Sequence, residues 1–215
     1  MLINRLSQVA TAATVAVMFF AVVWLQPILR TFPPTYGLAS AVAGAVASVG
    51  VYRLLSTAFL WLFSKTLWLR KLILGRGFLE GTWVGHYTRS NDHFITVEYI
   101  EQASGQTRIN GREFDAAGKT RASWASDTVS VDTERMRLVY AYTCTVFHRK
   151  HVQEGLGVFT MIRESSGTAP NKLDGYAVDL IDADRDPNTE LKISDEPVSD
   201  AQALAEAKNK FGIET

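Results

Sequence analysis

The feature that most constrains this chain is the absence of any acidic residue before Glu80. Residues 1–77 contain seven Lys and Arg residues and therefore have a net charge of +7. The other 15 Lys and Arg residues stand against all 22 Asp and Glu residues, so residues 78–215 have a net charge of −7. The zero net charge of the whole chain is a cancellation between two unlike halves, which excludes a single uniform globular domain.

An uncharged stretch of 24 residues separates Arg5 from Arg30. As a helix it would extend about 36 Å at ~1.5 Å per residue, which exceeds a ~30 Å hydrocarbon core. The sequence therefore predicts a transmembrane helix. The alternative is a cleaved signal peptide, which the length of this run and the second apolar run after it disfavour. Pro33 and Pro34 then predict a short hairpin loop.

A second apolar run begins near Thr35 and continues past Arg53, which predicts a second transmembrane helix and then a basic helical neck up to Gly77. Trp61 and Trp68 lie among basic residues, a pattern typical of the lipid headgroup layer; a surface amphipathic helix is the alternative. Small residues recur at four-residue spacing and favour close helix packing, either between the two spans or between protomers: Ser40, Gly44 and Ser48.

The distribution of basic residues predicts the orientation of these spans. Arg5 precedes the first span, Arg30 alone lies in the hairpin, and four basic residues follow the second span. The positive-inside rule then places both termini of a multi-pass protein in the cytoplasm.

From Phe78 onward the hydrophobic pattern changes from helical to alternating. Eight or nine short strands, separated by turn signals and without helical crossovers, predict an antiparallel barrel of about eight strands over residues 78–198. Residues 199–215 predict a short amphipathic helix with Ser199 as its N-cap and Gly212 as its stop. This helix either covers a barrel mouth or lies on the surface.

The sequence contains no pattern that indicates catalysis. It has no Gly-rich phosphate loop, no serine elbow and no metal-binding histidine spacing. The single cysteine, Cys144, excludes an intramolecular disulfide and a Cys-rich metal cluster. Most carboxylates after Asp179 are interpreted as solvating turns. We therefore expect no enzyme activity, no metal and no cofactor.

Strand periodicity places Leu138, Tyr140, Tyr142 and Cys144 on one face, which we expect to point into the barrel. Aromatic rings stack on nucleobases, and arginine side chains bind phosphate oxygens. Tyr99 is a further aromatic residue on the predicted strands. Because the domain is acidic overall, a phosphate ligand would require local clustering of its arginines. The candidate ligand-binding residues are Tyr87, Arg89, Arg108, Arg112, Trp124, Tyr140, Tyr142, Arg163 and Tyr176.

The triplet Gly81-Thr82-Trp83 is similar to the Gly-x-Trp opening of lipocalins. Together with the two predicted spans, the basic neck and the barrel, it makes the whole chain resemble the two-transmembrane, β-strand-rich (minimal β-barrel) effectors of bacterial cyclic-oligonucleotide antiphage signalling (CBASS). The resemblance covers nearly the full length, in architecture more than in motif. It implies a lipocalin-like barrel in which Trp83 forms the floor, packed under an arginine.

The resemblance also implies a function. In that family a partner nucleotidyltransferase, with no required direct contact, makes a cyclic di- or trinucleotide during phage infection. The barrel binds this ligand, and the membrane segments form a homo-oligomer that disrupts the bilayer of the inner membrane and kills the cell. A membrane-tethered, lipocalin-like binder of an apolar small molecule is the main alternative. An uncharacterised membrane enzyme is the third.

Overall fold

The structure is a computed structural model of the whole chain. It describes residues 8, 11–20, 23–24, 37–89, 92–103, 106–147, 151–180 and 185–213. By its internal contacts the chain divides into two compact units, with the division between Ile73 and Leu74.

The unit before this division contains helix α2 (Gly37–Lys65) and most of helix α3 (Leu67–Leu74). The largely buried Arg70 of α3 donates hydrogen bonds from Nη1 to the carbonyl oxygens of Phe63, at 3.1 Å, and Ser64, at 2.6 Å. These carbonyls lie at the end of α2, where a helix lacks its own donors. Arg70, in the predicted basic neck, therefore caps α2.

The expectation of two transmembrane helices is wrong for the part of the chain that the structure describes, because no helix there is long and apolar enough to cross a membrane. The first expected span is described only in part, at residues 8, 11–20 and 23–24. The three small packing residues lie within α2, but their side chains also fall outside the description: Ser40, Gly44 and Ser48.

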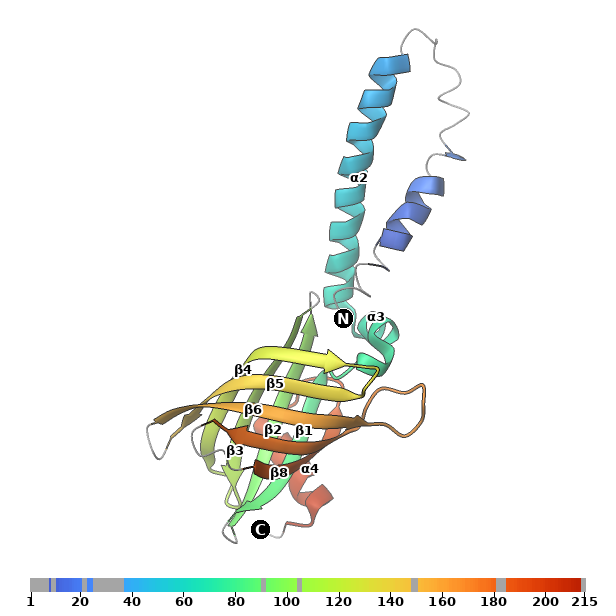
Figure 1. Cartoon of the computed structure of the whole chain (residues 1–215). Helices are drawn as coiled ribbons and strands as arrows, with labels where there is room; N and C mark the ends of the chain where they lie inside the picture. Colours follow the sequence, from blue (N-terminus) through green and yellow to red (C-terminus); the bar gives the residue numbers. More distant parts are fainter. Residues whose placement is uncertain are drawn as a thin grey trace. The chain divides into compact units, whose positions relative to one another are not determined.

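The second unit is a closed barrel of eight antiparallel strands, each paired with its neighbours in chain order (Figure 1). Strand β8 pairs with β1, so that no sheet edge is left open. The predicted eight-stranded antiparallel barrel is thus confirmed. A short 3₁₀ turn, η2 (Gly75–Gly77), leads into the strands, which are β1 (Gly81–Arg89), β2 (Asp92–Ala103), β3 (Gln106–Asp115), β4 (Thr120–Asp132), β5 (Arg137–Val146), β6 (His151–Ile162), β7 (Lys172–Asp179) and β8 (Arg185–Ser194).

The C-terminal helix α4 (Asp200–Phe211) lies on the outer face of β1 and β2 (Figure 1). Its buried Ala203 and Ala207 pack with Val84 of β1 and with Ile95 of β2. Ser199 accepts a hydrogen bond from the Gln202 backbone, and the N–H of the left-handed Gly212 reaches the Lys208 carbonyl. The predicted helix and both of its caps are confirmed, and its position is the outer wall of the barrel.

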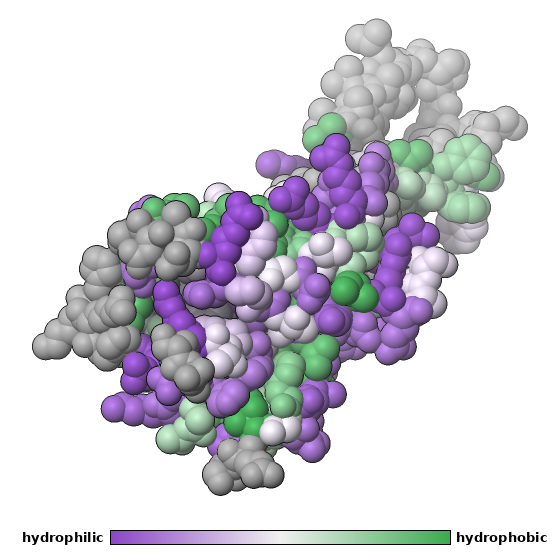
Figure 2. Space-filling view, turned by 60° about the horizontal axis from the view of Figure 1, so that its bottom comes forward, coloured by the Kyte–Doolittle hydropathy of each residue, from purple (hydrophilic) through white to green (hydrophobic). Residues whose placement is uncertain are grey.

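A separate apolar cluster fills one part of the barrel interior. Trp83 is fully buried there, and its indole Nε1 donates to the Leu79 carbonyl at 2.8 Å. The cation near its ring is Lys192, with Nζ 5.7 Å from the ring centroid, and not the expected arginine. The face of the molecule seen in Figure 2 carries mostly hydrophilic side chains, as expected for the outward positions of alternating strands. The buried residues of the cluster are Leu79, Trp83, Ile100, Ile109, Leu138, Tyr140, Phe159, Met161 and Leu173.

Buried Gln102 fixes the chain where it enters the barrel. Its Oε1 accepts hydrogen bonds from the backbone N–H groups of Leu79, at 2.7 Å, and Glu80, at 3.1 Å. Its Nε2 donates to the Gly77 carbonyl at 2.9 Å. One side chain on β2 therefore satisfies three backbone groups of the segment that precedes β1.

Candidate functional site

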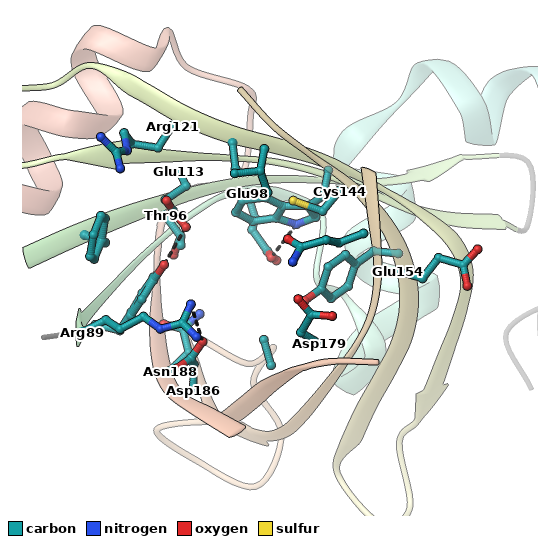
Figure 3. Close-up of a pocket in the computed structure, with 18 of the residues that line it drawn as sticks. Arg89, Thr96, Glu98, Glu113, Arg121, Cys144, Glu154, Asp179, Asp186 and Asn188 are labelled. Carbon is teal, nitrogen blue, oxygen red and sulfur yellow. Dashed lines mark hydrogen bonds and ion pairs between the residues drawn. The ribbon is translucent and has the colours of Figure 1, made fainter. Parts of the chain in front are cut away.

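The rest of the barrel interior is a cavity of about 340 Å³ that side chains from all eight strands line (Figure 3). The lining residues Arg89 and Asp186 keep side-chain exposures of 51% and 38%, so the cavity reaches solvent on their side. Glu98, by contrast, is only 2% exposed. The cavity therefore has an exposed end and a buried inner end.

One wall of the cavity is aromatic. The rings of Tyr140 and Trp124 lie with their centroids 5.8 and 6.4 Å from that of Tyr142. Both tyrosines lean over glycines of β6: a Cβ on Gly155 would lie 2.2 Å from the Tyr142 ring, and one on Gly157 would lie 2.6 Å from the Tyr140 ring. The paired glycines leave room for the rings to lie against the sheet, which holds the wall in place.

The barrel interior contains two buried carboxyl groups, those of Glu98, which lines the inner end of the cavity, and of its neighbour Glu190. Burial raises the pKa of both, and the charge of Glu98 raises the pKa of Glu190 further. The Glu190 carboxyl donates a hydrogen bond to Glu98. Two adjacent carboxylates repel each other strongly in a low dielectric, so this pair retains a shared proton at neutral pH.

Neutral donors hold the Glu98 carboxyl in place. The Tyr140 hydroxyl donates to Glu98 Oε1 at 2.6 Å, and the Trp124 indole N–H donates to the same oxygen at 3.2 Å. Asn188 Nδ2 donates to Glu190 Oε1 at 2.9 Å. The aromatic wall and the carboxyl pair are therefore one hydrogen-bonded network across four strands.

The exposed end is also rich in carboxylates. Arg89 Nη1 lies 3.9 Å from Asp186 Oδ2, and the Tyr87 hydroxyl donates to Glu113 Oε2 at 2.5 Å. Among the described residues, the basic ones that line the cavity are Arg89 and Arg121. Because acidic residues outnumber them, the cavity attracts cations and hydrogen-bond donors and opposes a deeply placed phosphate. The acidic lining residues are Asp92, Glu98, Glu113, Glu154, Asp179 and Asp186.

Cys144 also lines the cavity. Burial raises the pKa of its thiol to about 11, with nearby carboxylates adding to the shift. The thiol is therefore protonated at neutral pH and a poor nucleophile. Its place beside Tyr142 confirms that the expected face of β5 points inward.

The structure brings five of the nine candidate ligand-binding residues together around the cavity. They come from strands β1, β4 and β5, and whether they contact a ligand stays a prediction. The five are Tyr87, Arg89, Trp124, Tyr140 and Tyr142.

The other four candidates lie outside the cavity lining. Arg108 and Arg112 alternate with the buried Ile109 and thus occupy the outward face of β3. Arg112 pairs with Asp200 of α4, and Tyr99 donates to the same carboxylate at 2.6 Å. The interior cluster of arginines that a phosphate ligand would require does not form on β3, because both arginines of this strand face outward.

The remaining two have local partners of their own. Arg163 follows β6 and donates to the Ser166 carbonyl at 2.8 Å. Tyr176 lies under Arg185, whose guanidinium carbon is 4.9 Å from the ring centroid.

Sequence reasoning missed the carboxylates of the interior. Asp179 lies on β7, Asp186 and Glu190 lie on β8, and Asp179 and Asp186 line the cavity. The interpretation of the carboxylates after Asp179 as solvating turns is therefore wrong for Asp186 and Glu190. Glu98 shares one face of β2 with Phe94 and Thr96, and all three line the cavity. The sequence signal that could have identified Glu98 as an interior residue is its position within the apolar run of β2.

No family model, curated protein or solved structure matches this chain. Across the described ranges, no group of three His, Cys, Asp or Glu side chains is arranged to hold a metal ion. An aromatic wall beside fixed acceptors can bind a planar group that carries hydrogen-bond donors.

Proposed function

We propose that the barrel is the ligand-binding module of an antiphage effector and that its ligand is a cyclic oligonucleotide messenger. A base of the ligand enters the cavity, and its sugar-phosphate ring stays at the exposed end. The observation that carries this proposal is the aromatic wall of Trp124, Tyr140 and Tyr142 beside the buried acceptor Glu98. Stacking together with edge recognition is how proteins bind single bases.

The size and charge of the cavity support this orientation. A volume of 340 Å³ is near the lower limit of small-ligand sites, which span ~300–1,000 Å³, so it suits one base better than a whole cyclic oligonucleotide. The acidic interior opposes a phosphate at the inner end. Arg89, at the exposed end, is placed where a phosphate of the same ligand could pair with it.

The alternative of an apolar ligand has less support. Glu98 lines the inner end, and an apolar ligand would leave its polar atoms buried without new partners. Binding by the barrel can drive assembly only when the ligand has a higher affinity for the assembled state. Ligand-dependent self-association is therefore part of the proposed role.

The test is titration calorimetry of the full 215-residue chain against cyclic di- and trinucleotides at near-physiological salt. We expect one member to bind with micromolar or better affinity. Tyr142→Ala should weaken that binding about fivefold or more, because stacking contributes about 1–3 kcal/mol per base. Tyr176→Ala removes an aromatic ring outside the cavity lining and should leave the affinity unchanged. A folded protein that binds no member of the panel would overturn the proposal.

A further inference from the structure

Arg121 of β4 lines the cavity with a side chain that lacks a partner. The residue is partly buried, and its Nε atom is buried without a hydrogen-bond partner among the described residues. Arg121 also takes part in none of the ion pairs that form within the described ranges. Buried polar atoms are almost always satisfied in folded proteins, and an unpaired donor of a charged group is costly to bury. This donor therefore requires an explanation.

A bulge in β4 brings Arg121 to the cavity. Ala122 pairs with Glu113 of β3, but the next pair joins Thr120 to Phe114, so Arg121 is an extra residue in the ladder. In a regular strand, neighbouring residues point to opposite faces. Arg121 and Ala122 nevertheless both line the cavity. Bulges that redirect a side chain in this way are common at barrel rims and beside functional sites.

Arg121 lies at the exposed end of the cavity. The antiparallel register places the end of β1, the start of β2, the end of β3 and the start of β4 at one end of the barrel. Arg89 ends β1, so the two basic lining residues share this end (Figure 3). Arg89 already has a carboxylate partner, Asp186, which an incoming anion would have to displace. An anion at Arg121 has no such pair to displace among the described residues.

We propose that Arg121 is the principal phosphate-binding residue of the barrel and that it holds a phosphate group of the ligand at the exposed end of the cavity. A guanidinium group forms short, charge-assisted hydrogen bonds to phosphate oxygens, and the unpaired Nε–H supplies such a donor. Acidic lining residues such as Glu113, which accepts a hydrogen bond from Tyr87, oppose an anion elsewhere in the cavity. The inference deepens the proposed function and rests on it for the attachment of this phosphate to a base.

The test uses probes that are not nucleotides. Phenyl phosphate carries an aromatic ring and a phosphate anion, and its dimethyl ester keeps the ring and the phosphorus centre without the charge. Their affinities for the full chain are measured by ligand-observed NMR titration. We expect phenyl phosphate to bind about fivefold or more tightly, because only the anion gains charge-assisted hydrogen bonds from Arg121.

Two variants of equal charge locate the effect. Arg121→Gln should reduce the preference for phenyl phosphate to near unity. Arg108→Gln is the matched control, because it removes the same charge from an exposed position of β3 outside the cavity lining, and it should keep the full preference.

The Arg121 Nε–H resonance provides a second readout that uses the native chain. Arg121→Lys keeps the charge but has no Nε–H group, so the resonance that it lacks in a ¹H–¹⁵N spectrum is that of Arg121. In the native chain this resonance should shift when phenyl phosphate is added and stay in place when the dimethyl ester is added. This readout decides the question if Arg121→Gln does not fold.

Equal binding of the two probes to the native chain, or binding of neither, would overturn the proposal. A preference as large in Arg121→Gln as in Arg108→Gln, or an Arg121 resonance that phenyl phosphate leaves in place, would also overturn it. The cyclic nucleotide panel is scored separately. A phenyl phosphate preference that depends on Arg121, without nucleotide binding, would refute only the proposed function. A cyclic nucleotide that binds Arg121→Gln and Arg108→Gln equally well would refute only the role of Arg121.

Discussion

At the scale of single residues, the shared proton of Glu98 and Glu190 links the stability of the barrel to pH. Both groups have folded-state pKa values above their ordinary value, so the folded protein holds more protons than the unfolded chain above pH ~4.3. The free energy of unfolding should therefore fall as the pH rises from there toward the folded-state pKa values. Tyr140, Trp124 and Asn188 face the pair from the neighbouring strands and stay uncharged in this range.

Glu190→Gln should remove most of this pH dependence, because an amide cannot lose a proton. The variant should be more stable than the native chain at neutral pH and similar to it near pH 4. Urea unfolding at a series of pH values measures both effects. Glu206→Gln changes an exposed glutamate of α4 and should leave the pH profile unaltered. A native profile that is flat or rises between pH 5 and 8 would contradict the shared proton.

Gln102 gives a second prediction at this scale. Gln102→Leu keeps an apolar body at a buried position but removes the acceptor for the Leu79 and Glu80 N–H groups and the donor to Gly77. Unsatisfied buried groups cost about 1–3 kcal/mol each, so the free energy of unfolding should fall by about 2–4 kcal/mol. The measurement is urea unfolding beside Gln106→Leu, an exposed position on β3. Equal stability of the two variants would show that these bonds do not hold the chain entry.

At the scale of elements, the packing of α4 on β1 and β2 predicts a contrast between two alanines of one helix. Ala207 is fully buried, whereas Ala205 is exposed. Ala207→Leu should destabilise the protein by about 1–3 kcal/mol through overpacking, and Ala205→Leu should change the free energy of unfolding by less than about 0.5 kcal/mol. Thermal or urea unfolding of both variants tests the docking. Similar small effects in both would mean that α4 does not pack through this face.

The same helix explains which features of the fold could be predicted. Strand number, turns and the caps of α4 are local signals, and alternation on β5 correctly placed Tyr140 and Tyr142 inside. On β2 both faces are apolar, because Ile95 and Val97 lie under α4 while Ile100 lies in the interior cluster. Alternation cannot distinguish a core face from a face that another element covers, so the interior position of Glu98 was not recognised.

The prediction that the arginines of β3 point into the barrel was wrong for a related reason. Arg112 is outward, and its partner is Asp200, 88 residues later in the chain. Such a long-range ion pair leaves no local pattern, whereas the residue type alone suggested a phosphate contact.

At the scale of the whole molecule, the acidic half of the chain and the proposed anionic ligand are in conflict unless the phosphates stay at the exposed end. Asp186 is the carboxylate that competes most directly with a phosphate there, since it lies 3.9 Å from Arg89. Asp186→Asn should remove this competition and one negative charge from the cavity lining. The affinity for the cyclic nucleotide that binds the native chain should rise by up to about fivefold, as expected for an exposed ion pair worth up to about 1 kcal/mol.

The matched control for this prediction is Asp174→Asn. Asp174 forms a similar exposed pair with Lys172, at 3.7 Å, but does not line the cavity. Calorimetry at two salt concentrations should show a larger gain for Asp186→Asn at low salt, because screening weakens both the repulsion and the pair. Weaker binding in Asp186→Asn would mean that this carboxylate positions Arg89 for the ligand. An equal gain in both variants would mean that the net charge of the chain, and not the geometry at the exposed end, governs binding.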